Sequence, residues 1–467
     1  MARPMSATRS VYVCQQCGSS SPKWAGQCPS CEAWNTLVET VVVRASPVAA
    51  AVSRARAHAA ASANISQIGE VSSAEAARLS SGIGELDRVL GGGLVPGSIV
   101  LFGGDPGIGK STLLLQLAAR LAASGHSALY ITGEESVSQI RGRAERVGAV
   151  VEGIGLVATN DLATAIGAID AASPALAVVD SVQTLSSADL TGPAGSVGQV
   201  REVATRLAEV AKAGTTCVAL VGHVTKEGTV AGPRTLEHLV DAVIYLEGER
   251  LGTTRLLRAA KNRFGSTDEV GVLEMRAEGL TEVPDASRFF LESEQPPVAG
   301  SAITIALEGT RPLAVEIQAL VAPSGFGSPR RATTGVDANR VLMLIAVLAR
   351  HAGLNLGSHD VYVNVAGGLR IDEPAADLAV AMALASSLRE RPIHEGVVLA
   401  GELSLSGRLR PATRLERRLS EAGRLGFNRL VTGPPRGSAP AARAVGTIDL
   451  ATAIDLREAV RVALRGD

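Results

Sequence analysis

At 467 residues, the chain is too long for one hydrophobic core, and we expect about two to four domains. Hydrophobic residues make up 46% of it and the formal net charge is −1, which excludes a disordered protein and a uniformly basic coat protein. Aromatic residues amount to 3%, so an extensive surface for base stacking is not expected. Residues 1–10 lack the apolar segment of a signal peptide and no apolar run is long enough to cross a bilayer, which predicts a cytoplasmic protein without a membrane partner.

The first forty residues contain closely spaced cysteines. They form two Cys-x-x-Cys pairs, Cys14 with Cys17 and Cys28 with Cys31. Four thiolates at this spacing are typical of a closed tetrahedral Zn²⁺ site, which is structural because no ligand position stays open. A redox dithiol or an iron–sulfur cluster is the alternative. We therefore predict that residues 1–40 form a four-cysteine zinc finger in which Trp24 and Trp34 cover the metal.

A linker and then an α/β domain are expected next. Residues 41–69 are rich in Ala, Ser and Arg without a clear helical stripe, which predicts a flexible linker. Between residues 70 and 292, apolar strand candidates alternate with helical segments, the arrangement of a mainly parallel sheet covered on both faces. The strand candidates are Ile99–Phe102, Ala128–Thr132, Ala175–Val179, Cys217–Val221 and Ala242–Leu246.

The segment Gly104–Ser111 fits the phosphate-binding loop pattern G-x-x-x-x-G-K-[ST]. A strand precedes it and a helix with leucines along one face follows it, so backbone N–H groups and the positive end of a helix dipole would surround a polyphosphate. Lys110 would reach the β- and γ-phosphate oxygens of ATP, and the Ser111 hydroxyl would bind Mg²⁺. The residues expected to contact the nucleotide are Gly104, Asp105, Pro106, Gly107, Ile108, Gly109, Lys110, Ser111 and Thr112.

Carboxylates follow two of the predicted strands, at the edge where the ligands of parallel sheets collect. Asp180 comes directly after an apolar strand and can hold the water shell of Mg²⁺. Glu134 and Glu135 follow another strand, where a carboxylate would orient the attacking water. We assign that catalytic role first to Glu134 and second to Glu135. The alternative is that either carboxylate only interacts with a helix dipole.

Several stretches together resemble a known family. Gly82–Asp87, Leu90–Gly97 and the phosphate loop are similar to the opening of RecA-superfamily ATPases, which keep their catalytic glutamate one strand after that loop. With the zinc segment and the pentapeptide Lys261–Gly265 (Lys-Asn-Arg-Phe-Gly), the chain resembles the RadA (Sms) family of bacterial recombination and repair ATPases nearly end to end. The resemblance implies a RecA-like P-loop ATPase core.

The pentapeptide follows a strand-like segment and turns at Gly265. RecA-type rings bind ATP at subunit borders, where a cation from the neighbouring subunit stabilises charge on the transferring phosphoryl group. The resemblance implies this catalytic role for Arg263, together with Lys261. The alternative is that both are surface cations, or that Lys261 contacts DNA.

The resemblance implies that two loops, residues 186–195 and 225–234, correspond to the loops that line the central channel of RecA-like rings. Lys226 and Arg234 are the DNA-binding candidates there, because phosphate contacts supply most non-specific affinity for nucleic acid. His223 either senses the γ-phosphate or is a polar residue at the end of a core strand.

Residues 299–467 are expected to form a separate α+β domain. Three stretches in it resemble the proteolytic domain of Lon proteases: Val361–Gly368, Asp372–Asp377 and Ala400–Gly407. Where that family has its nucleophilic serine stands Ala375, and where it has its lysine base stands Arg418, which stays protonated. Peptidase activity is therefore not expected, and we interpret the domain as a scaffold that holds a ring together. A basic run is consistent with a DNA-facing surface or with solvated and paired cations: Arg408, Arg410, Arg414, Arg417, Arg418 and Arg424.

These features predict an ATP hydrolase that uses Mg²⁺, carries Zn²⁺ and works as a homo-oligomeric ring, which we expect to be hexameric. The resemblance implies a helicase-type motor on single-stranded and branched DNA, with branch migration and heteroduplex extension in cooperation with the RecA recombinase, associated with the bacterial nucleoid. One alternative is an ATP-gated DNA-binding switch without translocation. Another is an ATP-dependent protease, against which Ala375 and Arg418 argue.

Overall fold

The computed structural model describes residues 9–42, 78–222, 236–248, 252–291, 296–325, 328–435 and 448–466. These belong to two compact units, each of which is described by itself. Unit 1 comprises Met1–Arg250 and Arg255–Glu282, and unit 2 comprises Leu251–Thr254 and Val283–Asp467. Most of the predicted linker and three of the predicted loop residues, His223, Lys226 and Arg234, lie outside the described residues. No described helix is both long enough and apolar enough to cross a membrane.

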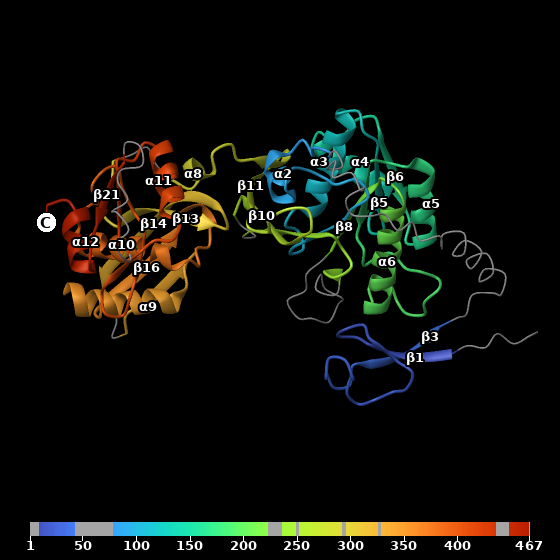
Figure 1. Ribbon diagram of the computed structural model, residues 1–467, viewed down its shortest axis with the longest axis horizontal. Coiled ribbons are helices and arrows are strands. Elements are labelled where there is room, and N and C mark those ends of the chain that lie inside the picture. The colour runs from blue at the N-terminus through green and yellow to red at the C-terminus, as the bar shows by residue number, and fades with distance from the viewer. Residues whose placement is uncertain are drawn as a thin grey trace, which may run out of the picture. The chain divides into compact units, whose positions relative to one another are not determined.

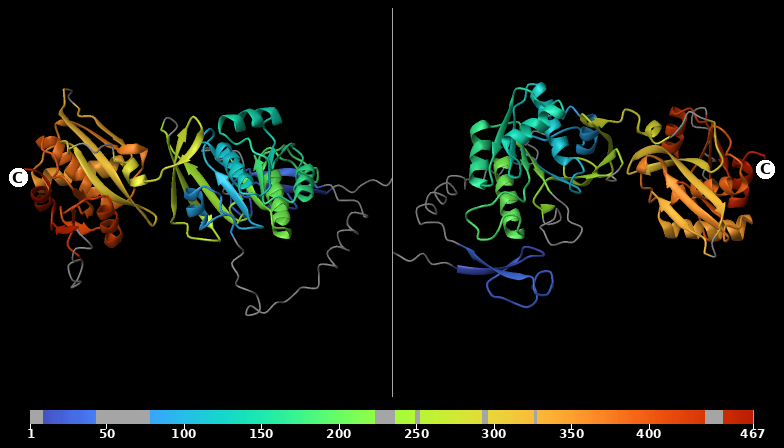
Figure 2. Two further views of the ribbon diagram at one scale, coloured as in Figure 1. Left: turned by 90° about the horizontal axis from the view of Figure 1, so that it is seen from above. Right: turned by 180° about the vertical axis from the view of Figure 1, so that it is seen from behind.

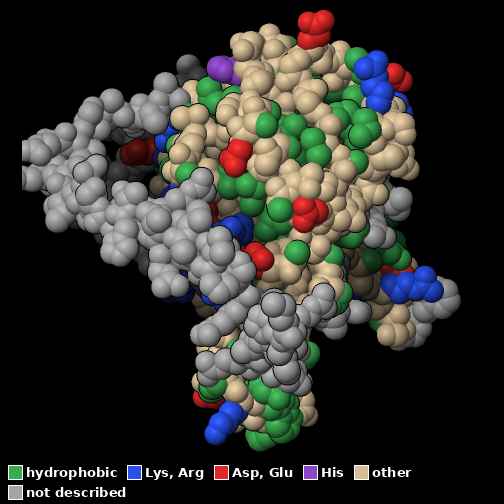
Figure 3. Space-filling model, turned by 90° about the vertical axis from the view of Figure 1, so that its right-hand side faces the viewer, with side chains coloured by type: hydrophobic (Ala, Val, Ile, Leu, Met, Phe, Trp, Pro, Cys, Tyr) green, Lys and Arg blue, Asp and Glu red, His purple; other side chains and the backbone are tan. Residues whose placement is uncertain are grey.

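The cysteine segment is a small antiparallel sheet. Its strands are β1 (Arg9–Cys14), β2 (Ser20–Ser21) and β3 (Leu37–Val42), in the order β2-β1-β3. The buried residues are Cys14, Cys28 and Leu37, so the sulfur cluster itself occupies the interior. The prediction that the two tryptophans cover the metal is wrong, because Trp24 and Trp34 are 59% and 71% exposed. Hydrophobic side chains accordingly gather on the surface of this segment (Figure 3).

A nine-stranded sheet forms the centre of unit 1, in the order β12-β11-β10-β9-β4-β8-β7-β5-β6. The strands from β4 to β9 are parallel to their neighbours, and β10, β11 and β12 extend the sheet with antiparallel pairing of β10 to β9 and of β11 to β12. The parallel strands are β4 (Ile99–Gly103), β5 (Ala128–Thr132), β6 (Ile154–Ala158), β7 (Leu176–Asp180), β8 (Cys217–Val221) and β9 (Ala242–Glu247). The antiparallel strands are β10 (Thr254–Asn262), β11 (Val270–Arg276) and β12 (Gly279–Glu282). The predicted α/β fold with a mainly parallel sheet is confirmed.

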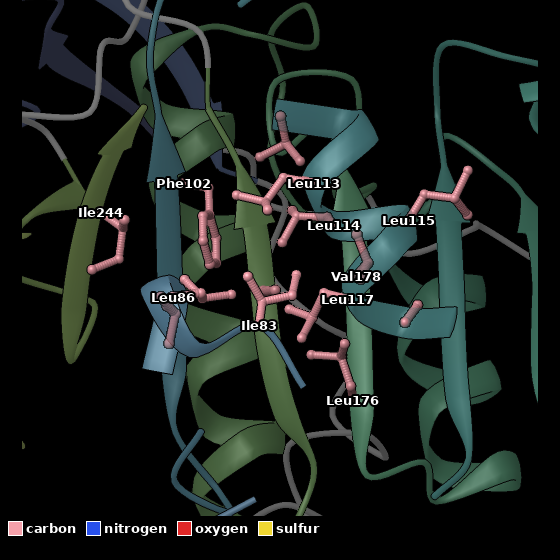
Figure 4. Close-up of a cluster of buried hydrophobic side chains, with 14 of the residues drawn as sticks. Ile83, Leu86, Phe102, Leu113, Leu114, Leu115, Leu117, Leu176, Val178 and Ile244 are labelled. Carbon is pink, nitrogen blue, oxygen red and sulfur yellow. The ribbon is translucent and has the colours of Figure 1, made fainter. Parts of the chain in front are cut away.

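Helices cover both faces of this sheet (Figures 1 and 2). On one face lie α2 (Gly84–Leu90), α3 (Lys110–Ala123) and α4 (Val137–Arg146), and on the other lie α5 (Leu162–Ala172) and α6 (Val197–Ala213). Figure 4 shows the first face, where Leu113, Leu114 and Leu117 of α3 pack over Phe102 and Val178 of the sheet. Because α3 is anchored by buried leucines along its length, its first residue is fixed against the end of β4.

Unit 2 combines two sheets and a hairpin with helices. One sheet has the order β13-β14-β16-β15 and the other β17-β20-β21, while β18 pairs with β19. The strands are β13 (Ser301–Glu308), β14 (Arg311–Pro323), β15 (Arg331–Thr334), β16 (His359–Val365), β17 (Val397–Leu399), β18 (Gly401–Leu403), β19 (Leu409–Pro411), β20 (Arg429–Thr432) and β21 (Asp449–Thr452). The α-helices are α8 (Ala286–Phe289), α9 (Ala338–Val347), α10 (Asp377–Arg389), α11 (Leu415–Arg424) and α12 (Leu456–Ala463). The first ten residues of α10 are all buried, so this helix is the core of the unit.

Candidate nucleotide-binding site

The phosphate loop joins the end of β4 to the start of α3, as its sequence predicts. Gly104, Gly107 and Gly109 all have positive φ, at 146°, 80° and 116°. A Cβ on Gly104 would lie 2.5 Å from the carbonyl oxygen of Leu246, and one on Gly109 would lie 2.5 Å from Met275 Cε. Glycine is therefore required at both positions by the backbone conformation and by the close neighbours.

Lys110 is the first residue of α3 and is 4% exposed. Its Nζ donates hydrogen bonds to the carbonyl oxygens of Gly104, at 2.7 Å, and of Asp105, at 3.0 Å. Burial lowers the pKa of Lys110, while the carboxylates of Asp180, Asp105 and Glu134 act in the opposite direction. A buried ammonium group directed into a loop of glycines is suited to pair with a phosphate oxygen.

Sequence reasoning missed a second cation that supports the loop. Arg255 of β10 is 5% exposed, and its Nε donates a hydrogen bond to the carbonyl oxygen of Ile108 at 3.0 Å. Burial lowers the pKa of this guanidinium group. The arginine lies next to the apolar pair Leu256 and Leu257, but β10 contains other cations as well, so the sequence alone does not single it out. The contact joins β10 to the phosphate loop across 147 residues of chain.

Asp180 is the last residue of β7 and is 6% exposed. Its Oδ2 accepts a hydrogen bond of 2.6 Å from the Tyr130 hydroxyl group, which belongs to the neighbouring strand β5. Burial and the Asp180 carboxylate together raise the pKa of Tyr130 well above its usual value. The Asp180 carboxylate also acts to raise the pKa of Lys110 in the phosphate loop. A buried carboxylate beside that loop, together with the Ser111 hydroxyl group at the start of α3, gives the oxygen donors that Mg²⁺ prefers.

Glu134 and Glu135 follow β5 and differ in their surroundings. Glu134 is exposed, and its Oε1 accepts a hydrogen bond of 2.7 Å from Ser181, the residue after Asp180. Glu135 is half-buried and forms an ion pair with Arg143 of α4. Glu134 influences the pKa of Lys110, whereas Glu135 is not among the causes of that shift. These contacts favour Glu134 as the carboxylate that faces the nucleotide.

Lys261 and Arg263 lie at the opposite end of the sheet from the phosphate loop of their own chain. The backbone N–H of Arg263 donates to the carbonyl oxygen of Asp241, whose own N–H donates to Ile99, the first residue of β4. The phosphate loop begins five residues further on, at Gly104, which corresponds to about 17 Å along a strand. Within one chain, the structure therefore does not bring these two cations to the phosphate loop.

Both cations are held by neighbours in unit 1. Nη1 of Arg263 lies 3.2 Å from Oδ1 of Asp241, while more than half of the arginine side chain is exposed. Lys261 Nζ donates hydrogen bonds to the carbonyl oxygens of Glu237, at 2.6 Å, and Val240, at 2.8 Å. Lys261 thus binds the segment that follows the predicted channel loop, which the pattern of the pentapeptide alone does not reveal.

The four predicted zinc ligands come together. The sulfur atoms of Cys14, Cys17, Cys28 and Cys31 all lie within 4.8 Å of one another. Cys14 and Cys31 are 3.6 Å apart, and Cys17 and Cys28 are 3.7 Å apart. Four thiolates around Zn²⁺ have S–S distances of about 3.8 Å, given Zn–S bonds of about 2.3 Å in a tetrahedron. The two closest sulfur pairs match this distance, and the cluster as a whole suits a four-thiolate zinc site.

The Lon-like residues of unit 2 form a charged contact without a nucleophile. Arg418 is fully buried, and its guanidinium group donates to both carboxylate oxygens of Glu373, at 2.9 and 2.7 Å. It also donates to the carbonyl oxygens of Ile305 and Thr413. Ala375, two residues after Glu373, is 6% exposed and lies in the hydrophobic core. The positions that resemble a catalytic pair therefore stabilise the fold.

The proposed basic surface of unit 2 needs correction at Arg418, because this residue is inside the core rather than on the surface. Of the other arginines, Arg410 pairs with Glu402, and Arg424 pairs with Asp285 and Glu421. Arg414 and Arg417 donate to backbone carbonyl groups.

Three family models match parts of the chain. Residues 12–39 match a rubredoxin metal-binding domain, residues 66–229 match an AAA domain, and residues 330–434 match the ChlI subunit of Mg-chelatase. The first match covers the cysteine cluster, and the second covers the phosphate loop, both glutamates and Asp180.

Curated proteins match over almost the full length. The chain is 47% identical to the DNA repair protein RadA of Bacillus subtilis (strain 168), over 99% of this chain and 100% of that protein. It is 47% identical to the DNA repair protein RadA of Listeria monocytogenes, over 92% of this chain and 93% of that protein. Among solved structures, the KaiC-like protein PH0186 of Pyrococcus horikoshii OT3 has a TM-score of 0.38 and 22% identity, covering 44% of this chain and 99% of that one.

Proposed function

Because the chain belongs to the RadA family of bacterial DNA repair proteins and contains the family's ATPase domain, we propose that it is a DNA-dependent motor driven by ATP hydrolysis. The motor assembles as a hexameric ring on single-stranded DNA, associated with the nucleoid. It acts on branched recombination intermediates, where it extends the heteroduplex by branch migration in cooperation with the RecA recombinase.

The observation that carries this proposal is the position of Arg263. The residue lies at the level of Ile99, about 17 Å along the sheet from Gly104, which is further than an arginine side chain reaches. About half of its side chain is exposed, and its guanidinium group lies beside Asp241. An arginine that cannot serve its own site, in a chain whose phosphate loop is otherwise complete, is explained by donation to the site of a neighbouring subunit.

The other residues then have separate roles at the subunit border. Lys110 and the loop from Gly104 to Thr112 bind the phosphates through backbone N–H groups and one ammonium group. Ser111 and Asp180 hold Mg²⁺, which neutralises charge on the phosphate oxygens. Glu134 accepts a proton from the attacking water and orients it, and Arg263 with Lys261 stabilises the charge that develops on the transferred group.

DNA binding is proposed for the channel loops. Lys226 and Arg234 would contact DNA phosphates, with Lys261 as a third candidate. Lys261 is bound to the carbonyl oxygens of Glu237 and Val240, so the same lysine connects the pentapeptide to the segment after the second loop. That contact supports a coupling between the state of the neighbour's nucleotide and the position of the loop.

An ATP-gated DNA-binding switch is the alternative. It would use the same residues to bind ATP and DNA but would not translocate along the DNA. An ATP-dependent protease is disfavoured, because Ala375 has no nucleophilic atom and Arg418 is locked to Glu373 in the core.

Mixed oligomers test the motor proposal. Arg263→Ala and Glu134→Ala should each bind ATP and lose hydrolysis, while mixtures of the two should recover part of the DNA-stimulated activity, because some borders then contain both intact residues. A mixture of Lys110→Ala with Glu134→Ala serves as the control, because both residues lie on the phosphate-loop side and no border is then intact. No recovery in mixtures of Arg263→Ala with Glu134→Ala contradicts donation between subunits. DNA-stimulated ATPase activity without unwinding of a forked DNA favours the switch.

A further inference from the structure

The carboxylate of Asp180 is held from one side only. Its Oδ2 accepts the 2.6 Å hydrogen bond from Tyr130, and Nη1 of Arg143 lies 4.0 Å from the same oxygen. Among the described residues, no hydrogen bond or ion pair reaches the other oxygen, Oδ1. Tyr130 is fully buried within the sheet, so its hydroxyl group has a fixed position. The two sides of this carboxylate therefore differ, with one oxygen engaged and one available.

Arg143 is fixed in turn by Glu135. Nη2 of Arg143 donates to Oε1 of Glu135, and this pair joins α4 to the segment directly after β5. Nη1 of Arg143 and Oε2 of Glu135 are both buried, and neither has a hydrogen-bond partner among the described residues. Buried polar atoms in proteins are nearly always paired with protein groups, ordered water or an ion. Here the unpaired nitrogen is the one nearest to Asp180.

We propose that Tyr130, Arg143 and Glu135 are positioning residues that orient Asp180 for magnesium. Tyr130 and Arg143 hold Oδ2, Glu135 holds Arg143, and Oδ1 is thereby left for the water shell of the metal. Partners of this kind, one step removed from the ion, control the orientation and basicity of metal-binding carboxylates. The network also gives Glu135 a task other than proton transfer, which leaves Glu134 as the carboxylate for the attacking water. The inference rests on the proposed assignment of Asp180 to Mg²⁺.

The test measures nucleotide binding rather than turnover. A fluorescent, non-hydrolysable ATP analogue is bound to the full-length protein, and Mg²⁺ is titrated to find the concentration at half-maximal effect. Tyr130→Phe, which keeps the buried ring, should raise that concentration about tenfold, as expected for the loss of an outer partner of a metal ligand. Arg143→Gln should act in the same direction, and Arg143→Lys should restore part of the loss. Binding of the analogue without Mg²⁺ should not change.

Two further variants distinguish a failure of the proposed network from a failure of the Mg²⁺ assignment. Arg141→Gln is the matched control, because Arg141 lies on the same helix but is exposed and pairs with Glu145. Asp180→Asn tests the metal assignment itself. If Asp180→Asn shifts the Mg²⁺ requirement and neither Tyr130→Phe nor Arg143→Gln does, the network is refuted while the assignment stands. If Asp180→Asn has no effect, the assignment falls, and the inference with it. The proposal would also be overturned if a variant with the melting temperature of the parent lost affinity for the analogue equally with and without Mg²⁺.

Discussion

Arg418 has a structural role at a position that resembles that of a peptidase base. The guanidinium group of Arg418 has no exposed surface. Its burial is stabilised because Glu373 and two backbone carbonyl groups accept its hydrogen bonds. Removing one partner of a buried ion pair leaves the other charge without compensation, which costs more than the pair itself contributes. The residue therefore supports the core of unit 2 at the position where the sequence resemblance places the lysine base of Lon proteases.

The contact between Arg418 and Glu373 predicts that substitution of Arg418 lowers the stability of the protein. Arg418→Met should lower the free energy of unfolding by about 3 kcal/mol, at the lower end for a broken buried pair because Glu373 retains some exposure. Urea denaturation of the full-length protein, followed by circular dichroism, measures the change. Arg408→Met is the control, since Arg408 is exposed and lies directly before β19. Equal stability of the two variants would contradict the role of Arg418.

At the scale of elements, a single carboxylate joins two helices of unit 2. Asp285 caps the N-terminus of α8 by accepting a hydrogen bond from the backbone of Arg288, and it accepts two more from Arg424 at the end of α11. The hydrogen bonds from Arg424 are the main reason that the pKa of Asp285 falls to about 2. A carboxylate whose pKa is lower in the folded state stabilises the fold above its unfolded pKa, about 3.9, and loses that contribution as the pH falls towards 2.

Asp285→Asn should therefore destabilise unit 2 at neutral pH and have little effect near pH 2. The difference in melting temperature between parent and variant should shrink progressively as the pH falls from about 5 to 2. Scanning calorimetry across this range gives the comparison. Asp449→Asn serves as a control, because Asp449 pairs with Arg429 on the surface and most of its side chain is exposed. A difference that does not depend on pH would show that the ion pair is not the source.

The interior of the cysteine segment consists mainly of its metal-binding cysteines, so the segment has no separate apolar core to stabilise it. Its buried residues are two cysteines and Leu37, and a segment of this size cannot fold around so small an apolar core. We expect one zinc ion per chain by metal analysis, and its loss in a Cys14→Ser and Cys28→Ser double variant. Both tryptophans of the protein lie in this segment and are exposed, so acrylamide should quench nearly all of the tryptophan fluorescence of the zinc-bound protein. Strong protection from acrylamide would contradict the exposed arrangement.

At the scale of the whole molecule, the sequence predicted what local patterns determine. The phosphate loop, the strands around it and the four-cysteine cluster each follow from residue types at fixed spacing. The contacts that join distant segments do not: Tyr130 and Asp180 are 50 residues apart, and their hydrogen bond depends on the pairing of β5 with β7. The distance between Arg263 and its own phosphate loop is likewise a consequence of sheet register.

The proposed DNA-binding loop yields the last prediction, because contacts to DNA phosphates make the affinity depend on salt concentration. Each contact to single-stranded DNA contributes about 0.7 to the slope of log affinity against log salt concentration. A Lys226→Ala and Arg234→Ala double variant should therefore bind oligo-dT more weakly, with a slope shallower by about 1.4. Arg206→Ala is the control, since Arg206 lies on α6 and pairs with Glu209. Fluorescence anisotropy from low to high salt gives both slopes. A double variant with weaker binding and an unchanged slope would mean that the two cations act on the loop itself and make no contact with the phosphates.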